Sequence, residues 1–161
     1  MAAVTAAPKG AKDAELTTGV AEYLTPVVID LLALAVEGKQ AHWHVRGPNF
    51  MPVHELLDTL VDHAREFSDL AAERIVTLDQ PLDARVPAIG ANTTVPTVTE
   101  GFQKTDVLVA DVVRAIDATL VTLRSAIDGL EDIDPVSQDL AIQVTTALEK
   151  DRWFLFSHIA K

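Results

Sequence analysis

The stretch His42–Glu73 reads HWHVRGPNFMPVHELLDTLVDHAREFSDLAAE, and it decides how the rest of the chain is interpreted. It contains four of the five histidines of the protein. No glycine or proline follows His54 within it, which predicts one long helix. At 100° per residue, Asp58 and Asp69 lie about 40° and about 60° from His54 around the helix axis, and Glu73 lies about 100° away. The spacing therefore predicts a single stripe of metal-binding side chains.

The two ends of this stripe are too far apart for one metal ion. At about 1.5 Å per residue, His54 and Glu73 stand about 28 Å apart along the axis. The positions are mirrored about the middle of the helix, because 54 pairs with 73 and 58 pairs with 69. A second copy lying antiparallel across the first would bring each end of the stripe to face the opposite end of its partner. Symmetry then produces two such sites.

His42 joins His54 in this prediction if the preceding helix runs alongside. Arg46–Asn49 has the turn chemistry of Gly-Pro-Asn, and a link this short joins antiparallel neighbouring helices. Two imidazoles and three carboxylates form a hard nitrogen and oxygen pocket that suits Fe(II), and Zn(II) is a substitute for the same ligands. The alternative is a solvated acidic helix face with a stray histidine.

A di-iron centre inside one bundle is excluded by the spacing of the acidic residues. Such centres use Glu-x-x-His pairs on two helices. No glutamate stands three residues before any histidine of this chain. The sequence therefore favours a centre shared between chains.

The residues around the stripe resemble the Dps family, the bacterial mini-ferritins known as DNA-binding proteins from starved cells. The resemblance covers about residues 18–159 and rests on a spaced motif, namely His42-Trp43, Arg46-Gly47-Pro48-Asn49-Phe50, His54-Glu55, Asp58, Asp69 and Ala72-Glu73-Arg74. It implies a ferroxidase centre shared between two subunits. One subunit supplies His42, His54 and Asp58, and the other supplies Asp69 and Glu73. It also implies Fe(II) oxidation by hydrogen peroxide, or more slowly by dioxygen, with Fe(III) mineral stored in a twelve-subunit shell that protects against oxidative damage.

The expected fold is an all-α, ferritin-like four-helix bundle with one long crossover carrying a short helix. Residues 16–161 form this domain, and the Ala-rich residues 1–15 form a flexible tail. Long helices are predicted over 18–45, 50–79, 104–128 and 135–160, with Gly129 closing the third. The crossover, residues 80–99, is predicted to carry its short helix around 82–88. Pro26 either kinks the first helix or marks its first turn.

Composition narrows the class of protein. Of the 161 residues, 48% are hydrophobic but only 5% are aromatic, which is typical of an aliphatic helix bundle. The absence of cysteine excludes disulfides and thiolate chemistry. We find no leader and no apolar run of membrane length, so a bacterial cytoplasmic protein is expected. The net charge of −11 disfavours broad contact with phosphate backbones and suits a protein that collects cations.

Further acidic residues have two interpretations each. Three carboxylates near the stripe are candidates for nucleating ferric mineral if they face the interior of a shell, and otherwise are solvated surface groups: Glu55, Asp62 and Glu66. The Dps resemblance implies that the corner before the last helix lines an Fe(II) entry pore, which Asp134 and Asp139 match. Without a pore, Asp134 caps that helix and Asp139 is a favourable acid near its N-terminus.

The tail leads to an alternative function. Lys9 and Lys12 are its only basic side chains, and in the Dps family basic tails of this kind can hold DNA. Many tails on one assembly would strengthen such binding by avidity. The alternative is thus a nucleoid-compacting, DNA-binding architectural protein with little ferroxidase activity. Asp13 and Glu15 offset the two lysines, so the sequence favours the ferroxidase.

Overall fold

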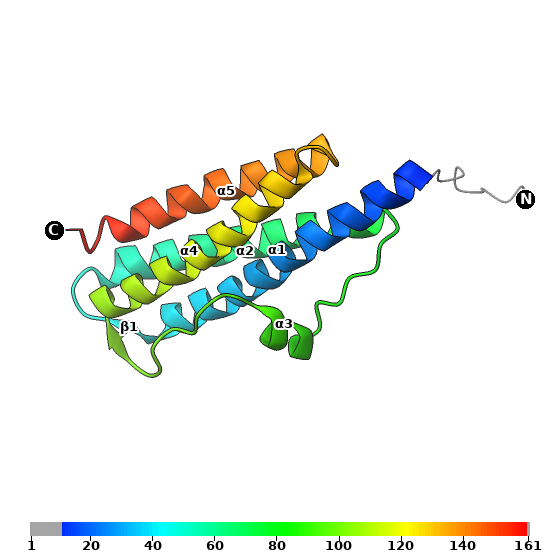
Figure 1. Cartoon of the computed structure of the whole chain (residues 1–161). Helices are drawn as coiled ribbons and strands as arrows, with labels where there is room; N and C mark the ends of the chain where they lie inside the picture. Colours follow the sequence, from blue (N-terminus) through cyan, green and yellow to red (C-terminus); the bar gives the residue numbers. More distant parts are fainter. Residues whose placement is uncertain (1–10, 161) are drawn as a thin grey trace, which may run out of the picture.

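The computed structural model describes residues 11–160 and their side chains from Ala14 onward. Four long helices lie side by side, and the connection between the second and the next long helix runs along the outside of the bundle (Figure 1). This connection carries one short helix, so the predicted all-α, ferritin-like bundle is confirmed. The elements in chain order are α1 (Ala11–His44), β1 (Val45–Arg46), α2 (Phe50–Thr77), α3 (Val86–Asn92), β2 (Gln103–Lys104), α4 (Thr105–Leu130) and α5 (Pro135–Phe156).

Helix boundaries differ from the predictions at several positions, including the ends of α2 and α5, which lie at Thr77 and Phe156 instead of residues 79 and 160. α1 begins at Ala11, so residues 11–15 of the predicted tail are helical, while residues 1–10 lie outside the described part of the chain. Pro26 lies inside α1 and does not mark its first turn. α3 occupies residues 86–92 instead of 82–88. α4 continues past Gly129, so this glycine does not close it.

Gly129 instead provides room for a neighbouring helix. A Cβ atom at this position would lie 2.2 Å from ring carbons of Tyr23 on α1. That separation is far inside van der Waals contact, so only glycine lets the ring pack directly on the backbone of α4. The glycine thus sets how closely α1 and α4 approach near the end of the bundle.

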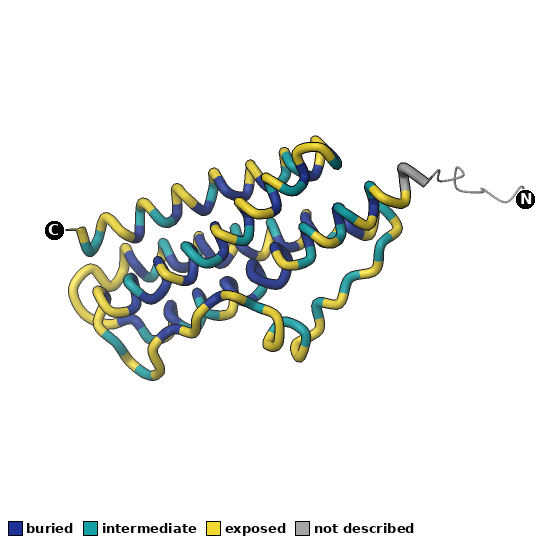
Figure 2. The backbone as a smooth tube through the Cα atoms, viewed as in Figure 1, coloured by how far each residue is buried: buried dark blue, intermediate teal, exposed yellow. Residues whose placement is uncertain are grey.

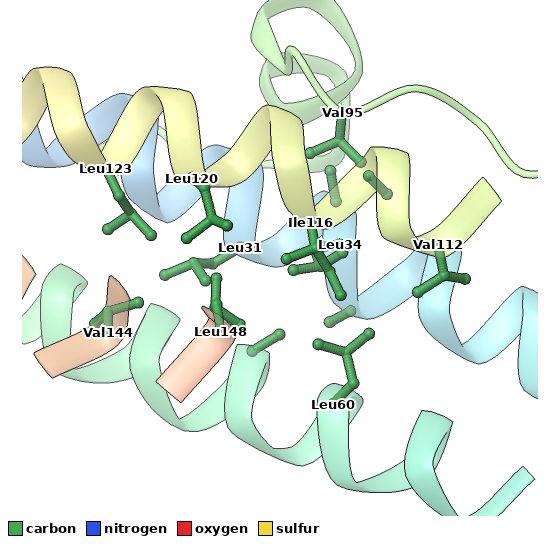
Figure 3. Packing of buried hydrophobic residues seen from close by; sticks show 14 of the residues in the cluster. Leu31, Leu34, Leu60, Val95, Val112, Ile116, Leu120, Leu123, Val144 and Leu148 are labelled. Carbon is green, nitrogen blue, oxygen red and sulfur yellow. The ribbon is translucent and has the colours of Figure 1, made fainter. Parts of the chain in front are cut away.

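The core is built from aliphatic side chains of all four long helices. Dark buried segments line the inside of each helix, and the outer faces are exposed (Figure 2). Leu31 and Leu34 of α1 point into the same interior space as Ile116 of α4 and Leu60 of α2 (Figure 3). Each of these side chains is fully buried. Burial of one such side chain stabilises the fold by about 1.5–3 kcal/mol.

α1 is apolar enough to raise the question of a membrane span. By length and composition alone, Ala14–His44 passes as a membrane-crossing helix, which corrects the sequence-based expectation that no such run exists. More than half of its most apolar window is buried inside the bundle. Central helices of globular bundles pass the same test, and α1 packs against both α2 and α4. The core therefore accounts for its apolar residues.

The crossover is attached to the bundle by two valines of the core, Val95 and Val98, and by polar contacts. α3 contains no buried residue. Carboxylates of Asp30, Glu37 and Asp111 accept hydrogen bonds from the segment that follows. Buried Asp30 accepts from the hydroxyls of Thr93 at 2.8 Å and Thr94 at 2.7 Å. The other two each accept from a backbone N–H at 2.8 Å.

A short pairing between β1 and β2 was not predicted from the sequence. The two strands are parallel, with Val45 opposite Gln103 and Arg46 opposite Lys104. Two-residue strands leave no periodic pattern for sequence analysis to detect. The pairing joins the turn between α1 and α2 to the start of α4.

Candidate metal centre

The turn between α1 and α2 brings His42 and His54 together. His42 lies in the last turn of α1 and is buried, and His54 lies in the second turn of α2. The turn reverses the chain with Gly47 at φ 109° and Asn49 at φ 61°, both left-handed conformations. The predicted antiparallel arrangement of these helices at the site is confirmed by the contact of the two rings.

The two imidazoles fix each other through main-chain groups. Their rings stack with centroids 3.6 Å apart and an interplanar angle of 22°. Nδ1 of His42 lies 3.0 Å from the carbonyl oxygen of His54, and Nδ1 of His54 lies 3.1 Å from the carbonyl oxygen of His42. Because a carbonyl oxygen only accepts, each Nδ1 carries the hydrogen in the neutral rings. The Nε2 lone pairs are therefore free to bind a metal ion.

Asp58 completes a cluster of three ligand groups. It follows His54 by one helical turn, and its Oδ1 lies 3.3 Å from Nδ1 of His42. One ligand atom from each of the three residues lies within 4.8 Å of the others, a spacing that could hold a metal ion. Among the side chains described, from residue 14 to residue 160, this is the one group of three or more such residues.

Lys39 holds the Asp58 carboxylate in the same cluster. Its ammonium group forms a salt bridge with Oδ1 of Asp58. This hydrogen bond lowers the pKa of Asp58, with a smaller contribution of the same sign from the charge of His42, while burial acts in the opposite direction. Sequence analysis missed Lys39, although its position three residues before His42 on α1 places it near the same helix face. A cation entering the site must compete with this ammonium group.

The remaining two predicted ligands do not join the cluster. Asp69 and Glu73 lie on α2, further along the helix, and both are exposed. α2 is unbroken from Phe50 to Thr77, so the axial separation expected from the sequence applies. A single chain therefore brings His42, His54 and Asp58 together and leaves the other two carboxylates apart from them.

The predicted nucleation residues occupy the surface of α2. Glu55, Asp62 and Glu66 are all exposed. Exposure is compatible both with solvation and with a mineral surface, so the structure leaves their role as a prediction.

The two predicted pore residues have different surroundings. Asp134 is buried and caps α5, accepting hydrogen bonds from the backbone N–H of Ser137 at 3.0 Å and from Arg74 at 2.7 Å. Burial opposes ionisation, but these hydrogen bonds outweigh it and lower the pKa of Asp134. Asp139 is exposed, and with Glu73 it lines a groove between α2 and α5. The capping interpretation of Asp134 is confirmed.

His63 has a structural partner that the sequence did not reveal. Its Nδ1 lies 2.7 Å from Oδ2 of Asp151 on α5, and the carboxylate is buried. Burial raises the pKa of Asp151, while the hydrogen bond with His63 acts in the opposite direction. The pair joins the middle of α2 to α5 and lies away from the metal cluster.

Comparison with known proteins agrees with this fold. Residues 21–161 match the family described as ferritin-like domain. A structure of Dps from Microbacterium arborescens in the high iron form is 46% identical, covers 99% of this chain and 100% of its own, and has a TM-score of 0.88. The DNA protection during starvation protein of Mycolicibacterium smegmatis is 36% identical over 121 residues, which is 75% of this chain and 66% of that protein. The same-named protein of Agrobacterium fabrum is 30% identical over 137 residues, or 84% and 85% of the two chains.

The helical bundle and the matched residues define a ferritin-like protein. Within that class, the chain belongs to the Dps family. The resemblance inferred from the motif around His42 and His54 is thereby confirmed. The chain spans just under two thirds of the length of the M. smegmatis relative.

Proposed function

We propose that the protein is a ferroxidase and iron store that oxidises Fe(II) at centres shared between two subunits. The observation that carries this proposal is the division of the ligand set along α2. Three ligand groups converge near one end of the helix, and Asp69 and Glu73 remain exposed further along it. An antiparallel copy across the middle of α2 would bring these carboxylates to the cluster of its partner.

Exposed apolar side chains beside both parts of the ligand set support this association. Trp43 and Met51, next to the histidine cluster, are 62% and 53% exposed. Leu70 and Val76, next to the distant carboxylates, are 42% and 54% exposed. Contact with a second copy would remove such surface from water, which favours association. The twelve-subunit shell expected of the Dps family remains part of the proposal.

The proposed reaction uses iron as substrate. Two Fe(II) ions each give one electron to one hydrogen peroxide molecule, whose oxygen–oxygen bond breaks, and hydrolysis of Fe(III) releases protons and forms ferric oxyhydroxide. Dioxygen is the slower oxidant. The imidazole and carboxylate ligands position the iron, and they bind Fe(III) more strongly than Fe(II), which favours oxidation. Zn(II) would occupy the same ligands without reacting.

The proposed roles of the other acidic residues depend on the assembly of a shell. Glu55, Asp62 and Glu66 would nucleate mineral if the exposed side of α2 that carries them faces the interior. Asp139 is the better candidate for an entry pore, because it is exposed at a groove. Asp134 is committed to capping α5 and to Arg74, so its part in a pore would be indirect.

Loss of two ligands from one cluster tests the proposal. We expect His54→Ala combined with Asp58→Ala to slow peroxide-dependent Fe(II) oxidation by more than about 100-fold, since loss of even an outer-shell partner costs about 10- to 100-fold. The measurement is the absorbance of Fe(III) after anaerobic Fe(II) loading and addition of peroxide. His44→Ala is the matched control, because the Nδ1 of His44 contacts the carbonyl oxygen of Gln40 and His44 is outside the cluster. Unchanged kinetics in the double variant would remove the site assignment.

DNA binding is a second candidate because the names of two relatives refer to DNA protection. The net charge of −11 opposes it, and the predicted DNA contacts Lys9 and Lys12 fall where the structure describes no side chains. A gel shift at low and at physiological salt distinguishes the functions, because retardation that survives physiological salt would promote an architectural role in the bacterial cytoplasm. We expect no such retardation.

A further inference from the structure

The turn that joins α1 to α2 needs support from outside itself. Asn49 adopts φ 61°, a left-handed conformation that is uncommon for residues other than glycine, and Gly47 adopts φ 109°. Such conformations persist where the surrounding structure holds them. The position of His42 relative to His54 depends on this turn, because the two rings meet directly across it.

Thr105, the first residue of α4, supplies part of that support. Its side chain is buried, and its hydroxyl lies 2.7 Å from the carbonyl oxygen of Pro48 and 3.1 Å from that of Arg46. A hydroxyl has one hydrogen, so the two turn carbonyls share a single donor. The parallel pairing of β1 with β2 ends at Lys104, directly before this hydroxyl. The start of α4 therefore contacts the turn through the strand pairing and through the Thr105 hydroxyl.

We propose that Thr105 is a positioning residue for the metal centre, which it does not touch. This inference rests on the proposed function, since it assigns a role in the same centre. The reciprocal bonds of His42 and His54, 3.0 and 3.1 Å long, join residues on opposite sides of the turn, so a shift of the turn lengthens both bonds and weakens them. Both rings then lose the contacts that direct Nε2 toward a metal ion.

Substitutions of Thr105 in the full-length assembled protein test the proposal with Co(II) as the probe. Thr105→Val removes the hydroxyl at nearly constant volume, and Thr105→Ser keeps it. Thr119→Val is the matched control, because Thr119 is a buried residue of the same helix whose hydroxyl donates only within α4, to Ala115 at 3.1 Å. We expect Thr105→Val to weaken Co(II) binding about tenfold and to change the visible spectrum of bound Co(II), with Thr105→Ser within about twofold of wild type. Thr119→Val should match wild type.

A second readout needs no metal. The amides of Phe50 and Val53 donate within the turn and the first turn of α2, to Gly47 and Asn49. Their hydrogen exchange should accelerate in Thr105→Val and not in Thr119→Val. If Thr105→Val does not assemble, the same measurements are made on Thr105→Ala.

The outcomes separate this inference from the proposed function. Wild-type Co(II) affinity and spectrum in Thr105→Val, or an equal loss in Thr119→Val, would overturn the role of Thr105 while leaving the metal centre in place. Absence of Co(II) binding by the wild-type protein would overturn the proposed function. In that case the exchange rates at Phe50 and Val53 still decide whether Thr105 holds the turn, and unchanged rates refute it.

Discussion

Two inactive variants of this protein should complement each other if its centres are shared. The first variant, His54→Ala with Asp58→Ala, lacks the clustered half of the ligand set. The second, Asp69→Ala with Glu73→Ala, lacks the distant half. On one unbroken helix, His54 and Glu73 stand about 28 Å apart and Asp58 and Asp69 about 16 Å apart at about 1.5 Å per residue. Neither variant can therefore rebuild a centre from its own chain.

The size of the effect follows from two-fold symmetry. With equal amounts of the two chains and random pairing, about half of the two-fold interfaces contain one chain of each kind. Each mixed interface has one complete centre and one centre that lacks both halves. About a quarter of the wild-type centres are thus regained in the mixture, against none in either variant alone.

The assay compares peroxide-dependent Fe(II) oxidation by each variant, by the co-assembled mixture and by wild type. We expect the mixture to reach about a quarter of the wild-type rate. A control mixture combines the first variant with His42→Ala, because both chains are then defective in the same half and no complete centre can form. A co-assembled mixture no faster than the mean of its components, or equal recovery in the control mixture, would refute the shared centre.

Three further predictions concern neighbouring features. Lys39→Met should tighten Co(II) binding up to about fivefold by freeing Asp58, since partly exposed ion pairs contribute about 0.2–1 kcal/mol. Calorimetric titration measures the Co(II) affinity, and weaker binding would show instead that Lys39 orients the carboxylate. Gly129→Ala should lower the melting temperature, because the clash with Tyr23 costs about 1–3 kcal/mol and exceeds the helix-propensity gain of about 1 kcal/mol; an unchanged melting temperature would contradict the close approach. Asp151 has a raised pKa in the folded state, so the folded state binds more protons above the ordinary value of 3.8 and the free energy of unfolding falls as pH rises through the raised value. This fall amounts to at most about 1.4 kcal/mol per pH unit, and Asp151→Asn should remove it, as melting curves recorded at successive pH values would show. The same pH dependence in the variant and in wild type would refute the prediction.

The sequence was informative where side chains repeat along one helix. The spacing of His54 and Asp58 on an unbroken α2, and the short turn that returns His42 to them, are properties of the local chain, and the structure confirms these three groups as a cluster. The cap of α5 by Asp134 also follows from a local signal, a proline at the first helical position.

The sequence was uninformative where distant segments meet. Gly129 follows a helical pattern in a position typical of a helix end, yet its role is set by the Tyr23 ring of another helix. Lys39 and Thr105 act on the site through contacts across the bundle or across the turn, which no single-residue pattern encodes. The partner of His63 likewise lies on another helix, so only the packed bundle shows it.

The attachment of the crossover to the outside of the bundle has a consequence for local unfolding of the protein. Hydrogen bonds to the carboxylates of Asp30, Glu37 and Asp111 secure the segment after α3, and α3 itself buries no residue. Releasing that segment exposes Val95 and Val98, which are buried against the core. The buried leucines all belong to the four long helices, so local unfolding of the segment costs less than unfolding of the whole chain. We expect the amides of this segment to exchange hydrogen with solvent before those of the helices. The segment can then unfold locally and refold while the four long helices stay folded.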